Sequence, residues 1–427
     1  MAKKADFLKI KDFDLEGKTV LTRVDLNTPI DPQSKKFLDT RRLEKHAETV
    51  QKLSKEGAKV VLLAHQGRPG AEYDFTNLEK HAERFSEFVG KDVKFVPDLM
   101  GPAAKKEIKK LDNGEILLLD NVRFLSEELL NRPSDVQATT HFVRSLAPLA
   151  DYFVNDAFAA AHRSQPSLVG FCEVVPSMLG KVLENEIKML DKVLDSKKKP
   201  YVFVAGGAKI KNTLNVIEQL LNRKIADKVL TSGLIASIFL VAKGYEIRGA
   251  EYVENYDQLV SKASGLLKEY NSKIELPMDL ALDKYGKRFE VSLAELPLPY
   301  RVADIGTGTI GRYKYIIEHA GTVIANGPAG IFEEKEFSKG TIQIVKAIAD
   351  SKSFSIVGGG HIATAVSDLG VSGKITHIST GGGACIRYLA GEPLPALETL
   401  KKTAEKFKSE KKNKKGKSKK KKKGGKK

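Results

Sequence analysis

The chain contains no tryptophan, only two cysteines and no long apolar segment among its 427 residues. Cys172 and Cys385 are too few for a disulfide framework or a thiolate metal cluster, so we expect a reducing, cytoplasmic compartment. Charged residues interrupt positions 1–18, where a signal peptide needs an apolar core. No run of about 18 apolar residues offers a membrane span. We therefore expect neither a secreted disulfide scaffold nor a membrane-spanning protein.

Positive charge is concentrated at one end of the chain. The formal net charge is +17, but residues 411–427 hold twelve lysines and no acidic residue, which leaves +5 for the other 410 residues. Such a run cannot bury apolar surface, so we expect a disordered tail over residues 406–427 that contacts polyanions weakly. A solvated tail without a partner is the alternative. For the nearly balanced body we expect no nucleic-acid partner.

Apolar, β-branched segments alternate with helical patterns along the body. Strands are expected at residues 18–26, 59–65, 115–121 and 151–157, and then at 201–207, 228–233, 301–306, 322–327 and 354–360. In the helical pattern that opens at residue 41, apolar side chains from Leu43 to Leu53 fall on one face, and Gly57 ends the helix. This alternation predicts parallel sheets covered on both faces, with ligands at the carboxyl ends of the strands.

A charged helical pattern at residues 183–200 separates the two series of strands. We predict an α/β fold of two similar-sized doubly wound domains, each with a mainly parallel sheet, which flank a cleft and are joined by a long helix. The first domain covers residues 1–180. The second covers residues 181–405, begins with the joining helix, and has a last segment that returns to the first domain.

Basic side chains recur after the strands of the first half. They are Arg23, Asp25 and Asn27, then Arg41 and Arg42 at a helix start, and then His65, Arg68, Arg123 and Arg163 with their neighbours. A single arginine is more often part of a surface ion pair. Several at one sheet edge can bind phosphate and carboxylate oxygens in bidentate fashion, which favours a small, highly anionic substrate.

Glycines recur after the strands of the second half, in the turns that contain Gly206, Gly233, Gly327 and Gly358. One glycine-rich turn is usually only a turn. Successive ones present backbone N–H groups that, with Lys209, can hold a polyphosphate, while Glu333 could accept hydrogen bonds from ribose hydroxyls. The series predicts a nucleotide site.

A competing motif lies at Gly306, Gly308 and Gly311, whose spacing is that of a dinucleotide fingerprint, with Glu333 at a suitable distance. The fingerprint normally opens its domain, whereas this array lies late in the second half. No pair of hydride-transfer residues accompanies it. A nicotinamide dehydrogenase is therefore the less favoured interpretation.

Taken together, these segments resemble the phosphoglycerate kinase family, archaeal type, from about residue 10 to residue 400. The segments TRVDLNTP, HQGRP, LLLDNVRF, VNDAFAAAHRS, VAGGAKI, ANGPAGIFE, GGGHIATA and HISTGGGA stand in the family's order. The resemblance implies reversible transfer of the ATP γ-phosphoryl to the carboxylate of 3-phosphoglycerate, with Mg²⁺ and closure of a hinge. The rival hypothesis is a nucleotide-binding module whose lysine tail is the working part.

The resemblance also implies the site residues. The substrate set is Asp25, Leu26, Asn27, Arg42, His65, Gln66, Gly67, Arg68, Arg123 and Arg163. The nucleotide set is Gly206, Gly207, Lys209, Gly233, Asn326, Glu333, Gly358, Gly359, Gly360, His361 and Ile362. Arg42 and Lys209 are the implied catalytic residues. Arg42 is preferred to Arg41 because an aliphatic residue, Leu43, follows it.

Three departures from the family pattern concern charge and metal. Thr213 stands where a second lysine is common, His361 stands where most members have aspartate, and Ile362 replaces the usual hydroxyl residue. One cation is therefore missing near the transferring phosphate. The residues that hold Mg²⁺ stay unknown.

Overall fold

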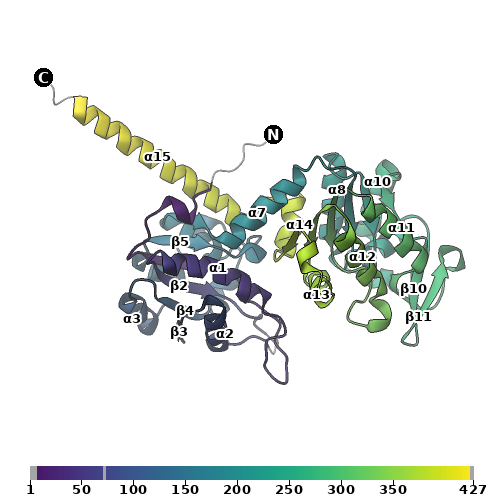
Figure 1. Cartoon of the computed structure of the whole chain (residues 1–427), viewed down its shortest axis with the longest axis horizontal. Helices are drawn as coiled ribbons and strands as arrows, with labels where there is room; N and C mark the ends of the chain where they lie inside the picture. Colours follow the sequence, from purple (N-terminus) through teal and green to yellow (C-terminus); the bar gives the residue numbers. More distant parts are fainter. Residues whose placement is uncertain (1–6, 71–73, 424–427) are drawn as a thin grey trace. The chain divides into compact units, whose positions relative to one another are not determined.

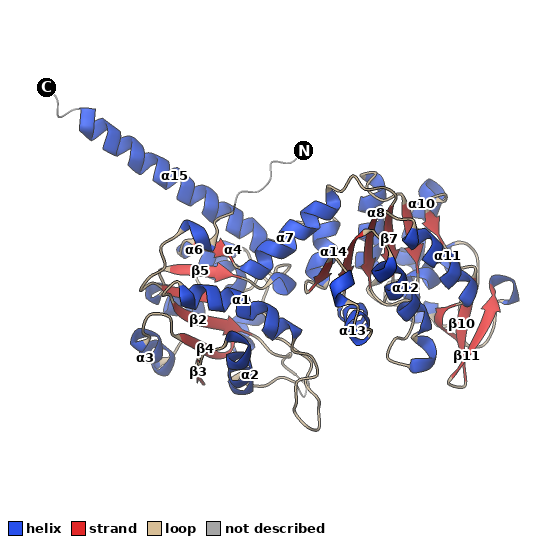
Figure 2. Ribbon diagram, in the orientation of Figure 1, coloured by secondary structure: helices blue, strands red, loops and turns tan. Residues whose placement is uncertain are grey.

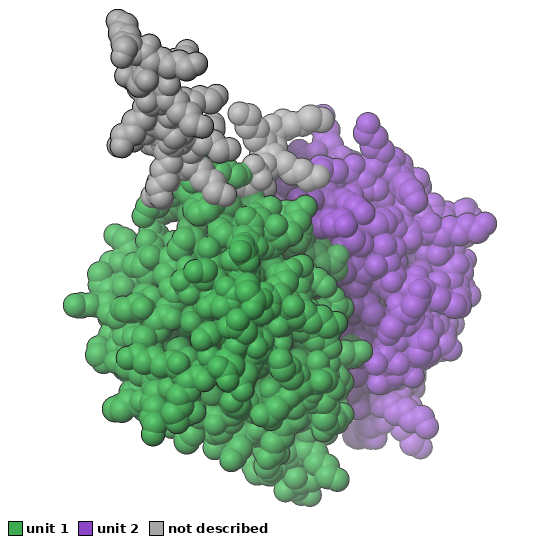
Figure 3. All heavy atoms as spheres, turned by 60° about the vertical axis from the view of Figure 1, so that its left-hand side comes forward, with its two compact units in different colours: residues 1–187, 393–427 green, residues 188–392 purple. Residues whose placement is uncertain are grey.

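The computed structural model describes residues 7–70 and 74–423, with side chains as far as residue 409. The chain forms two compact units, coloured separately in Figure 3. Unit 1 comprises residues up to Ile187 and those from Pro393 onward, and unit 2 comprises Lys188–Glu392. The division falls inside helix α7 (Lys181–Leu194), seven residues beyond the position 180 expected from the sequence. The segment after the second division belongs with unit 1.

The sheet of unit 1, whose strands are red in Figure 2, has six parallel strands in the order β3-β4-β2-β1-β5-β6. Its strands are β1 (Thr19–Arg23), β2 (Lys59–Ala64), β3 (Val93–Val96), β4 (Ile116–Asn121), β5 (Tyr152–Asn155) and β6 (Ser177–Leu179). The chain passes from β1 to β2 on one side and later adds β5 on the other. The loops after β1 and β5 therefore lead in opposite directions, which leaves space at the carboxyl ends of the strands, where α/β sheets bind ligands.

Several helices surround this sheet, and the longer ones pack on it through apolar side chains. They are α1 (Arg41–Lys55), α2 (Glu79–Val89), α3 (Pro102–Lys110), α4 (Ser134–Ala138), α5 (His141–Leu146), α6 (Phe171–Val174), the start of α7, and α15 (Pro395–Lys423). Leu43 and Leu53 of α1 are buried in one core with Val60 and Leu62 of β2. Gly57 follows α1 with φ +75°, a conformation that favours glycine. The helix expected there is confirmed.

Helix α15 differs from the expected tail. Ala404 is buried in the core of unit 1, and the ring of Phe407 lies 5.1 Å from that of Phe13. The packed part thus extends beyond residue 405, and the backbone stays helical to Lys423. Lysine has a high helix propensity, so a lysine-rich run can continue a helix that packing has started.

The main sheet of unit 2, the unit drawn from teal to yellow-green in Figure 1, has six parallel strands in the order β15-β14-β13-β7-β8-β9. Its strands are β7 (Tyr201–Ala205), β8 (Lys228–Thr231), β9 (Ile274–Glu275), β13 (Thr322–Asn326), β14 (Phe354–Gly358) and β15 (His377–Ser379). The order reverses between β7 and β13. The predicted class, two doubly wound α/β domains, is confirmed.

The helices of unit 2 form two sets. One set, α11 (Thr307–Glu318), α12 (Lys339–Asp350) and α13 (Gly360–Asp368), shares a core with β7, β13 and β14. The other set contains α8 (Ile210–Asn222), α9 (Gly233–Ala242), α10 (Tyr256–Tyr270) and α14 (Gly383–Leu389), which pack on one another. Across residues 7–70 and 74–423, no helix combines the length and apolar character that a bilayer crossing requires.

A second, three-stranded sheet in unit 2 was not foreseen. Strands β10 (Asp279–Lys284), β11 (Lys287–Ser292) and β12 (Arg301–Ile305) pair antiparallel in the order β11-β10-β12. The strand expected at residues 301–306 therefore exists, but its assignment to the parallel series is wrong. An apolar run indicates a strand and does not specify the direction of its partner.

Candidate functional site

The loops that follow β1, β2 and β4 in unit 1 are joined by side-chain contacts. Arg42, at the start of α1, donates from Nη1 to Oδ2 of Asp25 and to the carbonyl of Asn27, both at 2.9 Å. The Oδ1 atom of Asn27 accepts from the backbone N–H of Gly67 at 2.9 Å. Arg123 donates to the carbonyl of Gly67. The structure therefore brings together residues predicted from three separate strand ends.

A series of buried, hydrogen-bonded side chains supports this edge of the sheet. Arg23 is 1% exposed, donates from Nε to the hydroxyl of Ser167 at 2.9 Å, and places Nη2 2.9 Å from Nδ1 of His65. Ser167 in turn donates to the carboxylate of Glu128 at 2.5 Å. Glu128 and Ser167 were missed in the sequence, because no motif marks them.

The charges on this edge are mainly positive. We call Arg23, Arg42, Arg68, Arg123 and Arg163 the arginine edge. Burial, followed by the charges of Arg163 and Arg23, lowers the pKa of Arg123 to about 10. Burial and then the charge of Arg68 lower the pKa of Arg163. These guanidinium groups repel one another, and an anion that binds among them relieves this repulsion.

Asp25 is the carboxylate closest to Arg42. Burial would raise the pKa of Asp25, but the charge of Arg42, with a smaller contribution from Arg23, outweighs it and holds that pKa well below its usual value. Burial, followed by the charge of Arg23, also lowers the pKa of His65 well below its ordinary value. Asp25 therefore stays ionised and His65 stays neutral at physiological pH, so that His65 adds no charge to the edge.

Not every predicted residue of unit 1 has a side chain free for a ligand. Leu26 is completely buried in the core. The side chain of Gln66 donates to the carbonyl of Thr28 at 2.8 Å and accepts from its N–H at 2.9 Å. Arg41 pairs with Asp39 at 2.5 Å, away from Asp25. Leu26 and Gln66 therefore shape the site, and Arg42 is the arginine of the pair that reaches Asp25.

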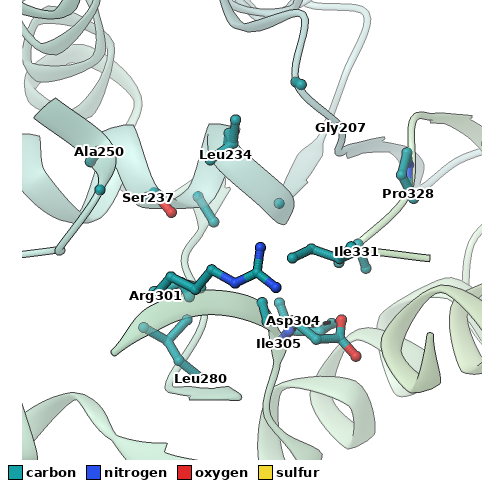
Figure 4. A pocket seen from close by; sticks show the side chains of 18 of the residues that line it. Gly207, Leu234, Ser237, Ala250, Leu280, Arg301, Asp304, Ile305, Pro328 and Ile331 are labelled. Atoms are coloured by element: carbon teal, nitrogen blue, oxygen red, sulfur yellow. Dashed lines mark hydrogen bonds between the residues drawn. The ribbon is translucent and has the colours of Figure 1, made fainter. Parts of the chain in front are cut away.

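A cavity of about 430 Å³ lies in unit 2 (Figure 4). Apolar parts of the wall come from α9, the three-stranded sheet and the loop after β13, and include Leu234, Leu280, Pro328 and Ile331. Gly207, Gly233, Glu333 and His361 were predicted and line the cavity. Arg301 and Asp304 were not predicted. Its volume and mainly apolar wall suit a planar base with few polar contacts.

Glycine turns close one end of the cavity, where the strand order reverses. A Cβ at Gly206 would lie 2.4 Å from the carbonyl oxygen of Pro328, and one at Gly233 would lie 2.9 Å from the nitrogen of Gly207. The turns after β7, β8 and β13 thus pack backbone against backbone, which only glycine permits. Asn326 is buried, and its Oδ1 has no hydrogen-bond partner among the described residues. A bound donor would satisfy this acceptor.

Three helices of unit 2 begin at the same edge. Helices α8, α9 and α13 follow β7, β8 and β14 directly, so their first N–H groups face the turn region. Lys209 is exposed immediately before α8, one turn from the buried Thr213. Thr213 donates to the carbonyl of Lys209 at 3.1 Å and therefore adds no charge. At this edge, an anion can bind to backbone N–H groups and to Lys209.

His361 and Glu333 form a pair at the cavity wall. Nε2 of His361 lies 3.2 Å from Oε1 of Glu333, and the two side chains are 66% and 56% exposed. Ile362 is 1% exposed and belongs to the core, so only its backbone can face a ligand. Among the residues described, no group of three His, Cys, Asp or Glu side chains is arranged to hold a metal ion. Unit 2 does not supply a metal cage of its own.

The competing glycine array serves another purpose. Asp279 accepts hydrogen bonds from the N–H groups of Gly308 and Thr309, both at 2.7 Å, at the start of α11. A Cβ at Gly306 would lie 2.3 Å from the carboxyl carbon of Asp279. The glycines therefore make room for an internal carboxylate, which occupies the place where a dinucleotide phosphate would bind.

An arginine-lined edge in one α/β unit and a glycine-lined cavity in another are typical of a kinase that acts on a small anion. A family model for phosphoglycerate kinase matches residues 10–392. The phosphoglycerate kinase of Methanothermus fervidus is 46% identical over 404 residues, covering 94% of this chain and 98% of that protein. That of Methanococcus maripaludis is 48% identical and covers 94% and 100%.

Solved structures agree with these sequences. The crystal structure of phosphoglycerate kinase from Pyrococcus horikoshii OT3 is 42% identical, with a TM-score of 0.87, and the match covers 93% of this chain and all of that one. The solved structure of phosphoglycerate kinase from Coxiella burnetii is 31% identical, with a TM-score of 0.75, and the match covers 93% of this chain and 99% of that one. The chain belongs to the phosphoglycerate kinase family. It is a phosphotransferase that passes the γ-phosphoryl of ATP reversibly to the carboxylate of 3-phosphoglycerate.

Proposed function

We propose that the arginine edge of unit 1 binds 3-phosphoglycerate and that the cavity of unit 2 binds ATP or ADP. The observation that carries this assignment is the contact of Arg42 with Asp25 and Asn27, because it places a guanidinium beside two hydroxyl-binding oxygens. Arg68, Arg123 and Arg163 bind the phosphate, and the neutral His65 donates a hydrogen bond. Asp25 and Asn27 accept from the substrate hydroxyl.

In unit 2, the apolar wall holds the base and Glu333 accepts from the ribose. The glycine turns at residues 206–207 and 358–360 and the start of α13 hold the phosphates through backbone N–H groups. Asn326 lies beneath these turns. His361 donates to a phosphate oxygen from the same side.

The reaction needs no covalent intermediate and no general base. The acceptor carboxylate is already ionised at neutral pH, so transfer depends on alignment and on neutralising the charge of the phosphoryl oxygens. Arg42 and Lys209 supply that charge from the protein. Because unit 2 offers no ligand cage, we propose that Mg²⁺ arrives bound to the nucleotide phosphates and water.

The assignment is tested by a coupled assay of phosphoryl transfer from ATP to 3-phosphoglycerate with the purified chain. We expect ADP release that depends on both substrates. Binding of ADP without any transfer would favour a nucleotide-binding module instead. ADP release at the same rate with and without 3-phosphoglycerate would overturn the assignment of the arginine edge. We also propose a reducing, cytoplasmic location, which is supported by the buried Cys172 and Cys385, neither of which is in a disulfide.

We propose a separate role for residues 411–427, which contain twelve lysines and neither an acidic nor an apolar residue. Such a segment binds polyanions through counterion release and not through insertion. Deleting it is expected to leave kcat and the melting temperature unchanged and to abolish salt-sensitive retention on a polyanion column. Loss of activity in the shortened chain would show that the segment belongs to the catalytic fold.

A further inference from the structure

Helix α1 carries polar side chains on a face that the reaction described above does not use beyond Arg42. Arg42, His46 and Thr49 are four and three residues apart, a spacing that places them along one side of a helix. His46 and Thr49 are both buried. Polar groups buried this deeply need partners. Thr49 contacts the start of α7, and His46 contacts a carboxylate that holds the same turn.

The partner of His46 is Asp156, which directly follows β5. Nδ1 of His46 lies 2.8 Å from Oδ2 of Asp156, and the two side chains are 2% and 0% exposed. The other oxygen of Asp156 accepts from the N–H groups of Val182 and Leu183 at 2.8 and 3.2 Å. One carboxylate therefore joins α1 to the first turn of α7.

Thr49 makes a second connection to the same turn. Its Oγ1 accepts from the N–H of Lys181 at 3.0 Å, so three of the first N–H groups of α7 are held by these two side chains. Gly180 makes the close approach possible, because a Cβ there would lie 2.1 Å from Oδ1 of Asp156. The backbone N–H of Asp156 also donates to the carbonyl of Arg23 at 2.9 Å. We call these contacts of His46, Thr49 and Asp156 with the start of α7 the joint. The joint lies next to Arg23, which belongs to the arginine edge.

Helix α7 is the element in which unit 1 ends and unit 2 begins along the chain. The face of α1 that carries His46 and Thr49 also carries Arg42, at the start of the helix. We propose that His46 is a positioning residue, which fixes α1 against the start of α7 through Asp156 and thereby sets the place of the Arg42 guanidinium. The inference rests on the proposed function of Arg42.

Physical reasons give the expected effect of losing this joint. Leucine at position 46 fills the space of the imidazole but leaves one oxygen of a buried carboxylate without a partner. The local structure then moves to hydrate that oxygen, and α1 is the element that must shift. A displacement of about 1 Å of a group that aligns the reaction lowers turnover about 10²-fold.

The experiment compares His46→Leu with His46→Asn, in which the amide nitrogen takes the place of Nδ1. We expect His46→Leu to lower kcat about 10²-fold, with an unchanged KM for ATP. His46→Asn is expected to restore kcat to within about threefold of the wild-type value. Gln51→Met is the matched control, because Gln51 ties the same helix to α2 through the carbonyls of Phe88 and Val89. It is expected to leave kcat unchanged.

A double-mutant cycle separates positioning from general damage. In the Arg42→Ala background, adding His46→Leu is expected to lower kcat by less than about threefold, because the group that it positions is already absent. An equal loss in both backgrounds, or failure of His46→Asn to restore kcat, would overturn the inference. If Arg42→Ala itself left kcat unchanged, the proposed function of Arg42 would fail, and the inference with it.

Thr49→Val extends the same test if His46→Leu does not fold, as judged by circular dichroism. It keeps the shape of the side chain and removes the acceptor for the Lys181 N–H. We expect a lower kcat that is again not additive with Arg42→Ala. An unchanged kcat in folded Thr49→Val would contradict the joint.

Discussion

Replacing His361 by aspartate tests whether this residue faces the nucleotide phosphates. His361 lies 3.2 Å from Glu333, and both side chains are more than half exposed, at 66% and 56%. An aspartate would therefore place a second negative charge beside Glu333 and the phosphates, in a medium close to water. The change leaves the glycine turns and the apolar wall untouched.

The expected loss of ADP affinity follows from Coulomb's law with the dielectric constant of water. Two unit charges about 4 Å apart in water repel by ~1 kcal/mol, which is about fivefold in affinity. Because ADP carries more than one negative charge, we expect its affinity without metal to fall by at least about fivefold. With Mg²⁺ the sign reverses, since a carboxylate oxygen is a good ligand for this cation and an imidazole is a poor one.

Isothermal calorimetry of ADP across a Mg²⁺ series measures both effects. The matched control is His361→Asn, which has the size of aspartate without its charge. We expect a steeper Mg²⁺ dependence for His361→Asp than for His361→Asn or the unchanged chain. Superimposable curves for the two variants would refute the reasoning and place residue 361 away from the phosphates.

Three further predictions use other contacts. Arg42→Ala should lower kcat by roughly 10³- to 10⁵-fold and leave the affinity for ADP unchanged. Arg41→Ala should change kcat by less than about threefold. The reverse ranking of the two variants in the coupled assay would exchange their roles. Asp25 has a lowered pKa, so its contribution to stability is complete above about pH 4 and is lost as pH falls further. Asp25→Asn should therefore flatten the pH dependence of urea unfolding below pH 4, and an equally steep loss would contradict this. Gly206→Ala should destabilise unit 2 by about 1–3 kcal/mol, while Gly360→Ala, with open space around its Cβ, should leave the melting temperature unchanged.

The arginine edge and the glycine turns could be anticipated because of a general property of parallel sheets. All the strands end on one edge, so residues that directly follow separate strands become neighbours without any knowledge of the helices between them. Asp25, Asn27 and Arg123 were reached in this way, whereas Gly67, which contacts both Asn27 and Arg123, was implied by the family resemblance. The same reasoning reached Gly206, Gly233 and Asn326.

Other features depend on contacts that no local pattern records. The segment before Gly306 has the apolar character of any buried strand, and only its pairing with Leu280 and its neighbours makes it antiparallel. The same pairing brings Leu280 and Arg301 into the cavity wall. Glu128 supports Arg23 through Ser167 from a short helix that has no sequence signature. These residues require the tertiary structure.

Unit 1 is discontinuous along the chain, and this affects the order in which the protein can fold during synthesis. The ribosome completes unit 2 at Glu392 before it adds α15, the last helix of unit 1. Ala396 of that helix donates to the carbonyl of Ala161, and Ala404 completes the core around β1 and β2. Unit 2 can therefore finish folding while unit 1, although made first, still exposes apolar surface. A chain released at Glu392 keeps every strand of the three sheets and loses only this covering. The anion-binding unit is then the part that chaperones and proteases would recognise.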